Sequence, residues 1–239
     1  MGTSKGYSAP TSPPWPDLKR KVSRQAPKGP PSNTSSKEIL NDFITANGGP
    51  SGMTGGRGGK AVQIVARDVA GFISAIEDLG FKEALRRSQL ENLIGKPADE
   101  ISFALIDHLG GLANTIDDVD VRNALSRVMH ELFKDAADYE DFERTMEANT
   151  SREELENFLT KFFGYYLFER FCRVFHERLV ARVGESKAQT FLNGILEYIR
   201  AMIRNKAKEK DLSSIEWSGK EGQSIIEEIL QETLEVFGG

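Results

Sequence analysis

The amino-acid sequence predicts an all-α protein, an irregular bundle of about seven to nine helices with a flexible or extended basic N-terminal arm. Apolar residues recur at three- and four-residue spacings along most of the chain, which is the period of an amphipathic helix. Glycine and proline interrupt these stretches at helix-length intervals. A weak extended pattern is confined to residues 212–217, so no sheet is expected.

Residues 1–35 form the predicted arm, which is rich in Pro, Ser, Gly and Lys. A segment of this composition buries too little apolar surface to offset the entropy lost on ordering. Tyr7, Trp15 and Leu18 are the side chains able to anchor such an arm on another surface. Regular structure is opposed by the prolines Pro10, Pro13, Pro14, Pro16, Pro27, Pro30 and Pro31.

Residues 36–59 are expected to form a short helix and a glycine-rich linker. Ser36 is placed to cap a helix over residues 37–46, whose Ile, Leu and Phe side chains share one stripe. The sequence Asn47-Gly-Gly-Pro then ends that helix. Five glycines within residues 51–59 predict a loop, either a hinge or a contact loop.

Residues 60–239 form the predicted helical body. Its longest helix starts at a capping box, Ser151 to Glu154, and continues to Gly184. The aromatic stripe from Phe158 to Phe175 makes this the central core helix, with a cofactor pocket as the less favoured alternative. Further helices are expected at about residues 60–79, 81–94, 101–109, 118–132, 139–146, 186–210 and 225–237, with Trp217 of the connector 212–217 docking on the bundle.

Charge is divided unevenly along the chain. Residues 1–60 contain nine Lys and Arg against three Asp and Glu, a net +6, and residues 61–239 contain 22 against 33, a net -11. An acidic body repels phosphate, so contact with nucleic acid would have to use the arm or a local patch. A single cysteine excludes an internal disulfide framework, and no apolar run is long enough to cross a bilayer. We therefore expect a cytoplasmic protein without a membrane span.

Two segments resemble ligand-binding loops but lack required residues. In the glycine-rich segment, Thr54 stands where a phosphate-binding loop needs its first Gly, and Ala61 stands where it needs Ser or Thr. Asp117, Asp118 and Asp120 lack the glycine and the closing glutamate of a calcium loop. A linker or contact loop is favoured for the first segment, and helix capping for the second.

The cysteine and the histidines yield no recognisable site. Cys172 and His176 are four residues apart and share a helix face, but His108 and His130 belong to other predicted helices without paired spacing. Packing is therefore favoured over metal binding. No set of nucleophile, base and orienting residue can be assembled, so we expect no catalytic, cofactor or metal site.

The extreme N-terminus is a chemically addressable end. Met1-Gly2 is a context in which the initiator methionine is removed, which leaves the amine of Gly2 on a sterically open segment. Myristoylation is disfavoured because Gly6 stands where that motif needs Ser or Thr. From these residues alone, an ordinary flexible tail is an equally good interpretation.

Four features within about the first 110 residues occur together: the opening Met1-Gly-Thr-Ser-Lys-Gly-Tyr-Ser-Ala-Pro with Pro14-Trp15, glycine-rich residues 48–59, Gly71-Phe-Ile-Ser, and Phe81-Lys-Glu-Ala-Leu-Arg. In combination they resemble the QatB family, the helical component of the bacterial Qat anti-phage defence system. Met-Gly-Thr-Ser at the start is the strongest element.

This resemblance implies a specific role. QatB-like proteins are encoded beside an ATPase, a TatD-like nuclease and a relative of QueC, the enzyme of 7-deazaguanine synthesis. The QueC-like enzyme is implied to act on the N-terminal glycine of its partner. Carried over to this chain, Gly2 is the modified position after loss of Met1, with Thr3 and Ser4 as its recognition context. Tyr7 and Trp15 complete the predicted partner-binding residues.

Our leading hypothesis is a non-catalytic defence component that binds a QueC-like enzyme and presents its N-terminal glycine for deazaguanine-type conjugation. The alternative is a nucleic-acid-binding or scaffolding adaptor that uses the basic arm. A third hypothesis is an enzyme whose site is not visible in the sequence. Nucleic-acid binding that weakens steeply with salt would favour the second, because released counterions drive such binding.

Overall fold

The computed structural model of the chain describes residues 10–55, 57–111, 115–206, 230–231 and 233–236. The described residues contain no strand, so the predicted all-α class is confirmed. They form ten α-helices of at least seven residues, more than the seven to nine predicted. The surplus comes from the N-terminal part of the chain, where an arm and a linker were expected.

The helices follow one another with short connections. Residues 230–231 and 233–236 are also helical. The elements are α1 (Trp15–Gln25), η1 (Ala26–Lys28), α2 (Asn33–Ala46), α3 (Gly49–Gly55), α4 (Arg57–Leu79), α5 (Phe81–Arg87), η2 (Glu91–Leu93), α6 (Ala98–Leu109), α7 (Ile116–Phe133), α8 (Tyr139–Ala148), α9 (Arg152–Val183) and α10 (Glu185–Lys206).

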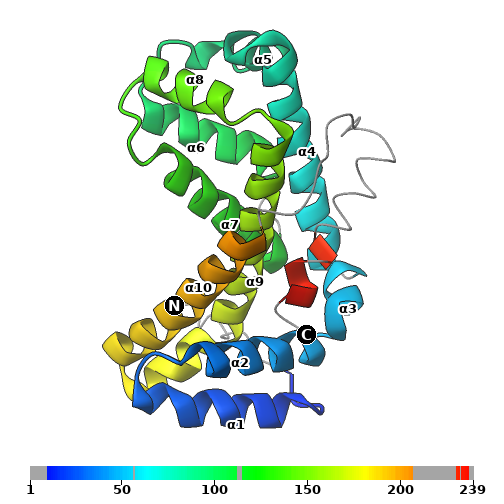
Figure 1. Cartoon of the computed structure of the whole chain (residues 1–239), viewed down its shortest axis with the longest axis vertical. Helices are drawn as coiled ribbons and strands as arrows, with labels where there is room; N and C mark the ends of the chain where they lie inside the picture. The colour runs from blue at the N-terminus through cyan, green and yellow to red at the C-terminus, as the bar shows by residue number, and fades with distance from the viewer. Residues whose placement is uncertain (1–9, 56, 112–114, 207–229, 232, 237–239) are drawn as a thin grey trace, which may run out of the picture.

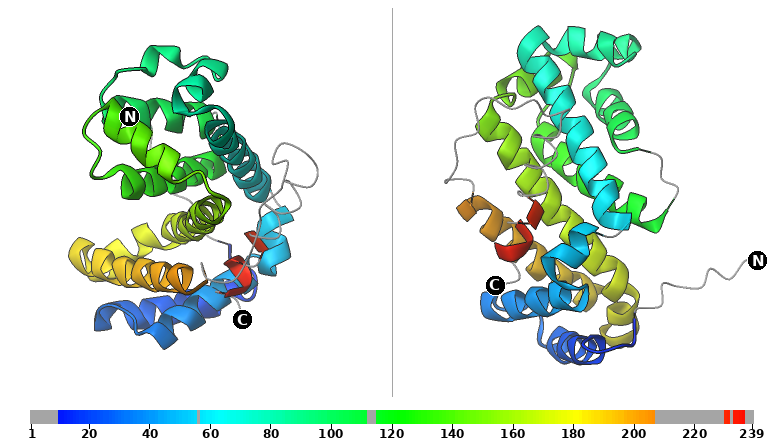
Figure 2. Two further views of the ribbon diagram at one scale, coloured as in Figure 1. Left: turned by 45° about the horizontal axis from the view of Figure 1, so that its top comes forward. Right: turned by 90° about the vertical axis from the view of Figure 1, so that its right-hand side faces the viewer.

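The longest helix, α9, runs through the middle of an elongated molecule (Figure 1). Helices α4 to α8 gather around its N-terminal part, and α1, α2 and α10 gather around its C-terminal part. Two further views show α1 and α2 side by side below α9 and α10 (Figure 2). The molecule therefore has two ends, joined by α9.

The ends of α9 are as the sequence predicts. The Ser151 hydroxyl oxygen accepts a hydrogen bond from the Glu154 backbone N–H at 3.3 Å, which satisfies one free amide of the first turn. Gly184 ends the helix with φ +81°, a conformation that glycine adopts without steric penalty. Phe163 and Phe171 are fully buried, so the aromatic stripe is core as predicted.

Helices α7 and α10 both run antiparallel to α9. Between α7 and α9, Glu131 pairs with Lys161 at 2.9 Å, and Asp117 pairs with Arg173 at 2.8 Å. The residue numbers of the partners on α9 therefore increase as those on α7 decrease. On the α10 side, the backbones approach closely at Gly164, where a Cβ would lie 2.5 Å from the Ile203 side chain. Helix α9 is therefore packed between α7 and α10, and the buried core extends from these contacts into α1, α2, α4, α5, α6 and α8.

The described part of the predicted arm is folded, which corrects the prediction of a flexible segment through residue 35. Trp15, Leu18 and Val22 recur at helical spacing, and all three are buried. Pro16 lies in the first helical turn, where its missing N–H would have no partner in any case. The prolines therefore flank α1 instead of interrupting it, and α2 and α9 supply the apolar surface that the arm itself lacks.

The segment after α1 also differs from the prediction. Helix α2 begins earlier than predicted: Ser32 accepts from the Ser35 N–H at 3.2 Å and is the N-cap, and Ser36 is a buried residue inside the helix. The described residues of the predicted loop 51–59 are helical instead, divided between α3 and α4. Buried Met53 anchors α3 to the core, which offsets the low helix propensity of its glycines.

Most other boundaries agree with the prediction. Gly80 follows the end of α4 and Gly110 follows the end of α6. The N-cap of α7 is Thr115, upstream of the aspartates expected to cap it, and Asp118 completes a capping box with it. The predicted helix over residues 81–94 is divided into α5 and η2, with Gln89 between them at φ +60°. The connector 212–217, Trp217 and most of the predicted helix 225–237 lie outside the described residues.

Candidate binding site at the N-terminal helix

The predicted site residues fall into two groups. Gly2, Thr3, Ser4 and Tyr7 lie outside the described residues. Trp15 is only 4% exposed, and its indole meets the Phe43 ring edge to face, with centroids 5.9 Å apart. Its ring therefore anchors α1 to the chain's own body, which differs from the expected role as an exposed anchor for a partner.

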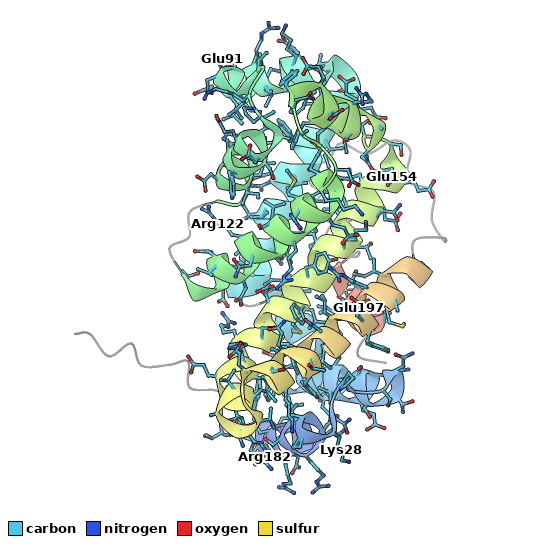
Figure 3. All side chains as sticks on the ribbon, turned by 90° about the vertical axis from the view of Figure 1, so that its left-hand side faces the viewer. Lys28, Glu91, Arg122, Glu154, Arg182 and Glu197 are labelled. Carbon is cyan, nitrogen blue, oxygen red and sulfur yellow. The ribbon has the colours of Figure 1, made fainter. Side chains whose placement is uncertain are left out.

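The rest of α1 is fastened to the body by buried and polar contacts. Ser23, itself buried, accepts hydrogen bonds from two arginines of α9: Arg178 reaches its hydroxyl at 3.2 Å and Arg182 its carbonyl at 2.8 Å. At the other end, the Lys19 ammonium donates to the Pro10 carbonyl at 2.6 Å. Figure 3 shows Arg182 and Lys28 at the end of the molecule that contains α1, and Glu91 at the opposite end. The first described residues are therefore held against a fixed helix.

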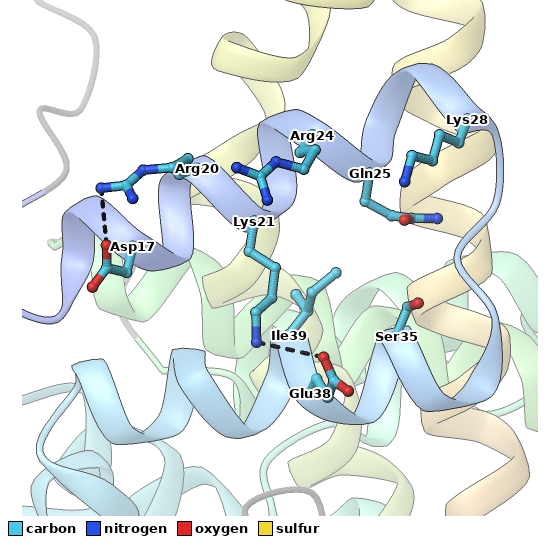
Figure 4. A pocket seen from close by; sticks show the side chains of 9 residues that line it. All are labelled: Asp17, Arg20, Lys21, Arg24, Gln25, Lys28, Ser35, Glu38 and Ile39. Atoms are coloured by element: carbon cyan, nitrogen blue, oxygen red, sulfur yellow. Dashed lines mark ion pairs between the residues drawn. The ribbon is translucent and has the colours of Figure 1, made fainter.

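A pocket of about 290 Å³ opens between α1 and α2 (Figure 4). Four of its lining side chains are cationic, and they project from α1 and η1 along one side. The α2 side contributes a hydroxyl, a carboxylate and an apolar floor. The lining residues are Asp17, Arg20, Lys21, Arg24, Gln25, Lys28, Ser35, Glu38 and Ile39.

Two of these cations are engaged and two are not. Arg20 pairs with Asp17 at 3.0 Å. Lys21 pairs with Asp42 at 2.5 Å and with Glu38 at 3.6 Å, and the hydrogen bond to Asp42 is the main cause that raises the pKa of Lys21 above 10.5. Among the described residues, Arg24 and Lys28 have no ion-pair or hydrogen-bond partner. The pocket is therefore cationic along its α1 side.

The aspartates at the start of α7 serve helix capping and ion pairing. Asp118 accepts from the Thr115 N–H at 2.8 Å, as the capping interpretation predicts. Arg173 lies between Asp117 and Asp120, at 2.8 Å and 3.0 Å. Burial raises the pKa of Asp120 to about 7, although the guanidinium of Arg173 opposes this shift. These carboxylates hold α7 on α9.

Cys172 and His176 do not form a site with further ligands. Cys172 is partly buried, and this burial raises the pKa of its thiol well above the usual range, so the thiol stays protonated. The His176 Nε2 atom lies 3.7 Å from a Glu185 oxygen. Across the described ranges, no group of three or more His, Cys, Asp or Glu side chains is placed to hold a metal ion.

A second hollow, which the sequence did not indicate, lies between α6 and α7 and also has a volume of about 290 Å³. Phe103 on its rim is 71% exposed. In the sequence, Phe103 lies off the apolar stripe formed by Ile101, Leu105 and Leu109, and this position could have indicated that its ring is exposed. The helices of the described residues include none long and apolar enough to cross a membrane.

The fold and the pocket together define an all-α protein built on one long central helix, with a cationic N-terminal helix at one end. The family model described as QatB, Qat anti-phage system associated protein, matches residues 48–237. The chain therefore belongs to the QatB family of Qat anti-phage system proteins. No curated protein and no solved structure matches it.

The matched range tests the basis of the resemblance seen in the sequence. The family assignment is confirmed. Glycine-rich residues 48–59 and the segments beginning at Gly71 and Phe81 lie inside the match. The opening Met-Gly-Thr-Ser and Pro14-Trp15 lie before it, as do all of α1 and α2. The family match therefore supports the assignment through the helical body and not through the N-terminal residues.

Proposed function

We propose that this chain acts in the Qat system as a non-catalytic partner of a QueC-like enzyme, and that it presents Gly2 as the acceptor of a deazaguanine-type group. Membership of the Qat system supports the proposal. The single structural observation that carries it is the fixed mounting of α1: Trp15 is buried, Ser23 is held by α9, and Lys19 binds the Pro10 carbonyl. An N-terminus that starts from a fixed point is suited to presentation.

The mounting limits where Gly2 can be. An extended chain spans at most about 3.3–3.6 Å per residue, so Gly2 lies within roughly 29 Å of Pro10. An enzyme docked beside α1 therefore finds the amine within this radius. The same enzyme docked at α5, at the opposite end of the molecule, would lie farther from the point where the N-terminal residues begin (Figure 1). The N-terminal helix is thus the expected docking region for the QueC-like partner, and the ATPase and TatD-like nuclease of the system are further candidate partners.

In the proposed reaction this chain supplies only the acceptor amine. An α-amine has an ordinary pKa of about 7.7–8.0 and is partly neutral at cellular pH, so it can attack an activated carboxyl carbon. The ATP-using partner activates the carboxyl group of a deazaguanine acid. An amide bond then forms to Gly2, the activating group leaves, and the amine loses a proton. Glycine offers the least steric hindrance to this attack, and Thr3 and Ser4 add hydroxyls for hydrogen bonds.

The proposal is tested by intact-mass measurement after co-expression with the QueC-like neighbour. We expect a chain that lacks Met1 and carries one added group, and fragmentation should place that group on Gly2. Gly2→Ala should reduce the modified fraction because of the added methyl group. One extra residue before Gly2 should abolish modification while leaving the far-ultraviolet circular dichroism spectrum unchanged. An unshifted mass, with both proteins intact and the neighbour active, would refute the modification.

A further inference from the structure

The N-terminal helical segment has a charge opposite to that of the body. From Trp15 to Lys28 it contains five basic residues and a single acidic one, Asp17. Residues 61–239 carry 33 acidic against 22 basic residues. Electrostatic interactions between exposed charges fade over about 8 Å at physiological salt, and α1 lies at one end of the molecule (Figure 1), so much of the acidic body is too distant to cancel its field.

Three of these cations form a regular row. Arg20 and Arg24 are four residues apart on α1, which places them on one face at a step of about 6 Å. Lys28 follows four residues later, at the end of the 3-10 helix η1. All three are exposed and line the same pocket (Figure 4). This step is comparable to the separation of successive phosphates along a nucleic-acid strand. A row of cations along the edge of an open pocket therefore suits a linear polyanion.

The charges in this row are available to a ligand. Arg24 and Lys28 have no partner within the described part of the chain. The pair between Arg20 and Asp17 is largely exposed, and such pairs are weak, so a phosphate can displace Asp17 from Arg20. Lys21, also on α1, is already neutralised by Glu38 and Asp42 of α2. A bound anion is therefore directed along α1.

The pocket lacks the features of a protein-docking site. Arginine occurs at protein interfaces as well, but there it accompanies apolar and aromatic anchors, and the apolar residue in this lining, Ile39, is only 1% exposed. Among the described residues, its lining also contains no aromatic ring on which a base could stack. Arginine and lysine contacts to phosphate position a strand without reading its sequence. These properties favour the backbone of a nucleic acid over an acidic protein segment.

We propose that the pocket between α1 and α2 binds the phosphodiester backbone of a single nucleic-acid strand, through Arg20, Arg24 and Lys28 and without base recognition. The site contacts about three phosphates. The proposal does not depend on modification of Gly2, since it uses no residue of the N-terminal tail. It requires that the QueC-like partner docks beside α1 without covering this pocket.

Fluorescence anisotropy with a labelled oligothymidylate of about 20 nucleotides tests this site. For three phosphates the affinity should scale with salt with a log–log slope of about -2, so raising salt from about 50 to 200 mM should weaken binding about 16-fold. The triple variant Arg20→Gln, Arg24→Gln, Lys28→Gln should bind at least about tenfold more weakly at the lower salt, with a much flatter salt dependence. Glutamine is a good helix former, so α1 should persist in the circular dichroism spectrum.

A matched variant controls for net charge. Lys82→Gln, Arg86→Gln, Arg87→Gln removes the same three charges from exposed positions of α5, at the opposite end of the molecule. Its affinity should stay within about twofold of the unmodified chain, apart from a small general effect. Equal losses in the two variants, or no loss in the α1 variant, would overturn the proposal. Tighter binding of poly-glutamate than of the oligonucleotide at equal salt would also overturn it, in favour of an acidic peptide.

Discussion

The indole of Trp15 meets the ring of Phe43 edge to face, with centroids 5.9 Å apart and planes at 87°. Phe43 in turn contacts Phe171 and Phe175, at 5.3 Å and 6.3 Å between centroids. Edge-to-face packing of this kind adds to the apolar area that each ring buries. The first helix of the chain is thereby joined to the central helix through one continuous cluster of rings.

Trp15→Ala should destabilise the protein by about 3–5 kcal/mol, because it empties the space that the indole fills in this cluster. Urea unfolding measures the loss, and hydrogen exchange should show that the amides of α1 lose protection. Phe103→Ala is the control, because that ring is 71% exposed and its removal should change stability by no more than about 0.5 kcal/mol. A loss below about 1 kcal/mol for Trp15→Ala would contradict the docking of α1.

Phe163→Ala should also cost about 3–5 kcal/mol, since this side chain is fully buried on α9. Unlike Trp15→Ala, it should not selectively expose the amides of α1. Unfolding curves together with hydrogen exchange distinguish the two variants. A loss of protection limited to α1 in Phe163→Ala would show that the ring does not support the whole core.

Two glycines inside helices should respond oppositely to alanine. At Gly194 an added Cβ would lie 2.6 Å from Pro31 Cδ and 3.1 Å from Pro30 Cβ, and these rigid rings cannot rotate away. Such overpacking costs about 1–3 kcal/mol, more than the roughly 1 kcal/mol that alanine adds in helix propensity. At Gly71 nothing lies within 4 Å of the added atom, so alanine should stabilise by about 0.5–1 kcal/mol. Thermal and urea unfolding measure the stability of both variants. Equal gains in stability for the two alanine variants would contradict this packing.

Asp120 should make stability fall as pH rises. Its pKa is raised from 3.8 to about 7 in the folded protein, mainly by burial, so the folded state holds this proton where the unfolded chain has lost it. Stability from this group is therefore greatest below about pH 4 and declines up to about pH 7, by at most about 1.4 kcal/mol per pH unit. Asp120→Asn cannot lose a proton and should lack this component.

Urea unfolding of both proteins at about pH 5 and about pH 8 isolates this component, because other titrating groups are common to both. The advantage of the unsubstituted chain over Asp120→Asn should shrink at the higher pH. An advantage that grows with pH would mean that the ionised carboxylate, paired with Arg173 at 3.0 Å, is the more stable form in the folded protein.

Local sequence was sufficient where a helix and its ends depend on neighbouring residues. Ser151 caps α9 because its hydroxyl reaches an amide one turn away, and Gly184 ends it because glycine tolerates a positive φ. The periodic apolar stripe of α9 likewise identifies its buried face, whatever covers that face. The fold class and most helices of the body could be predicted on these grounds, whereas the QatB family was identified from the resemblance of short sequence motifs.

Only the tertiary structure shows that the described N-terminal segment forms a docked helix. An isolated helix as short as α1 is marginal in water, and its composition favours disorder, so local sequence led to the wrong prediction of a flexible segment. Phe43 and Phe171 come from distant parts of the chain, and they supply the surface on which Trp15 is buried. The cationic pocket has the same origin, because it exists only where α1 has docked beside α2, and no local pattern encodes the contact between two helices.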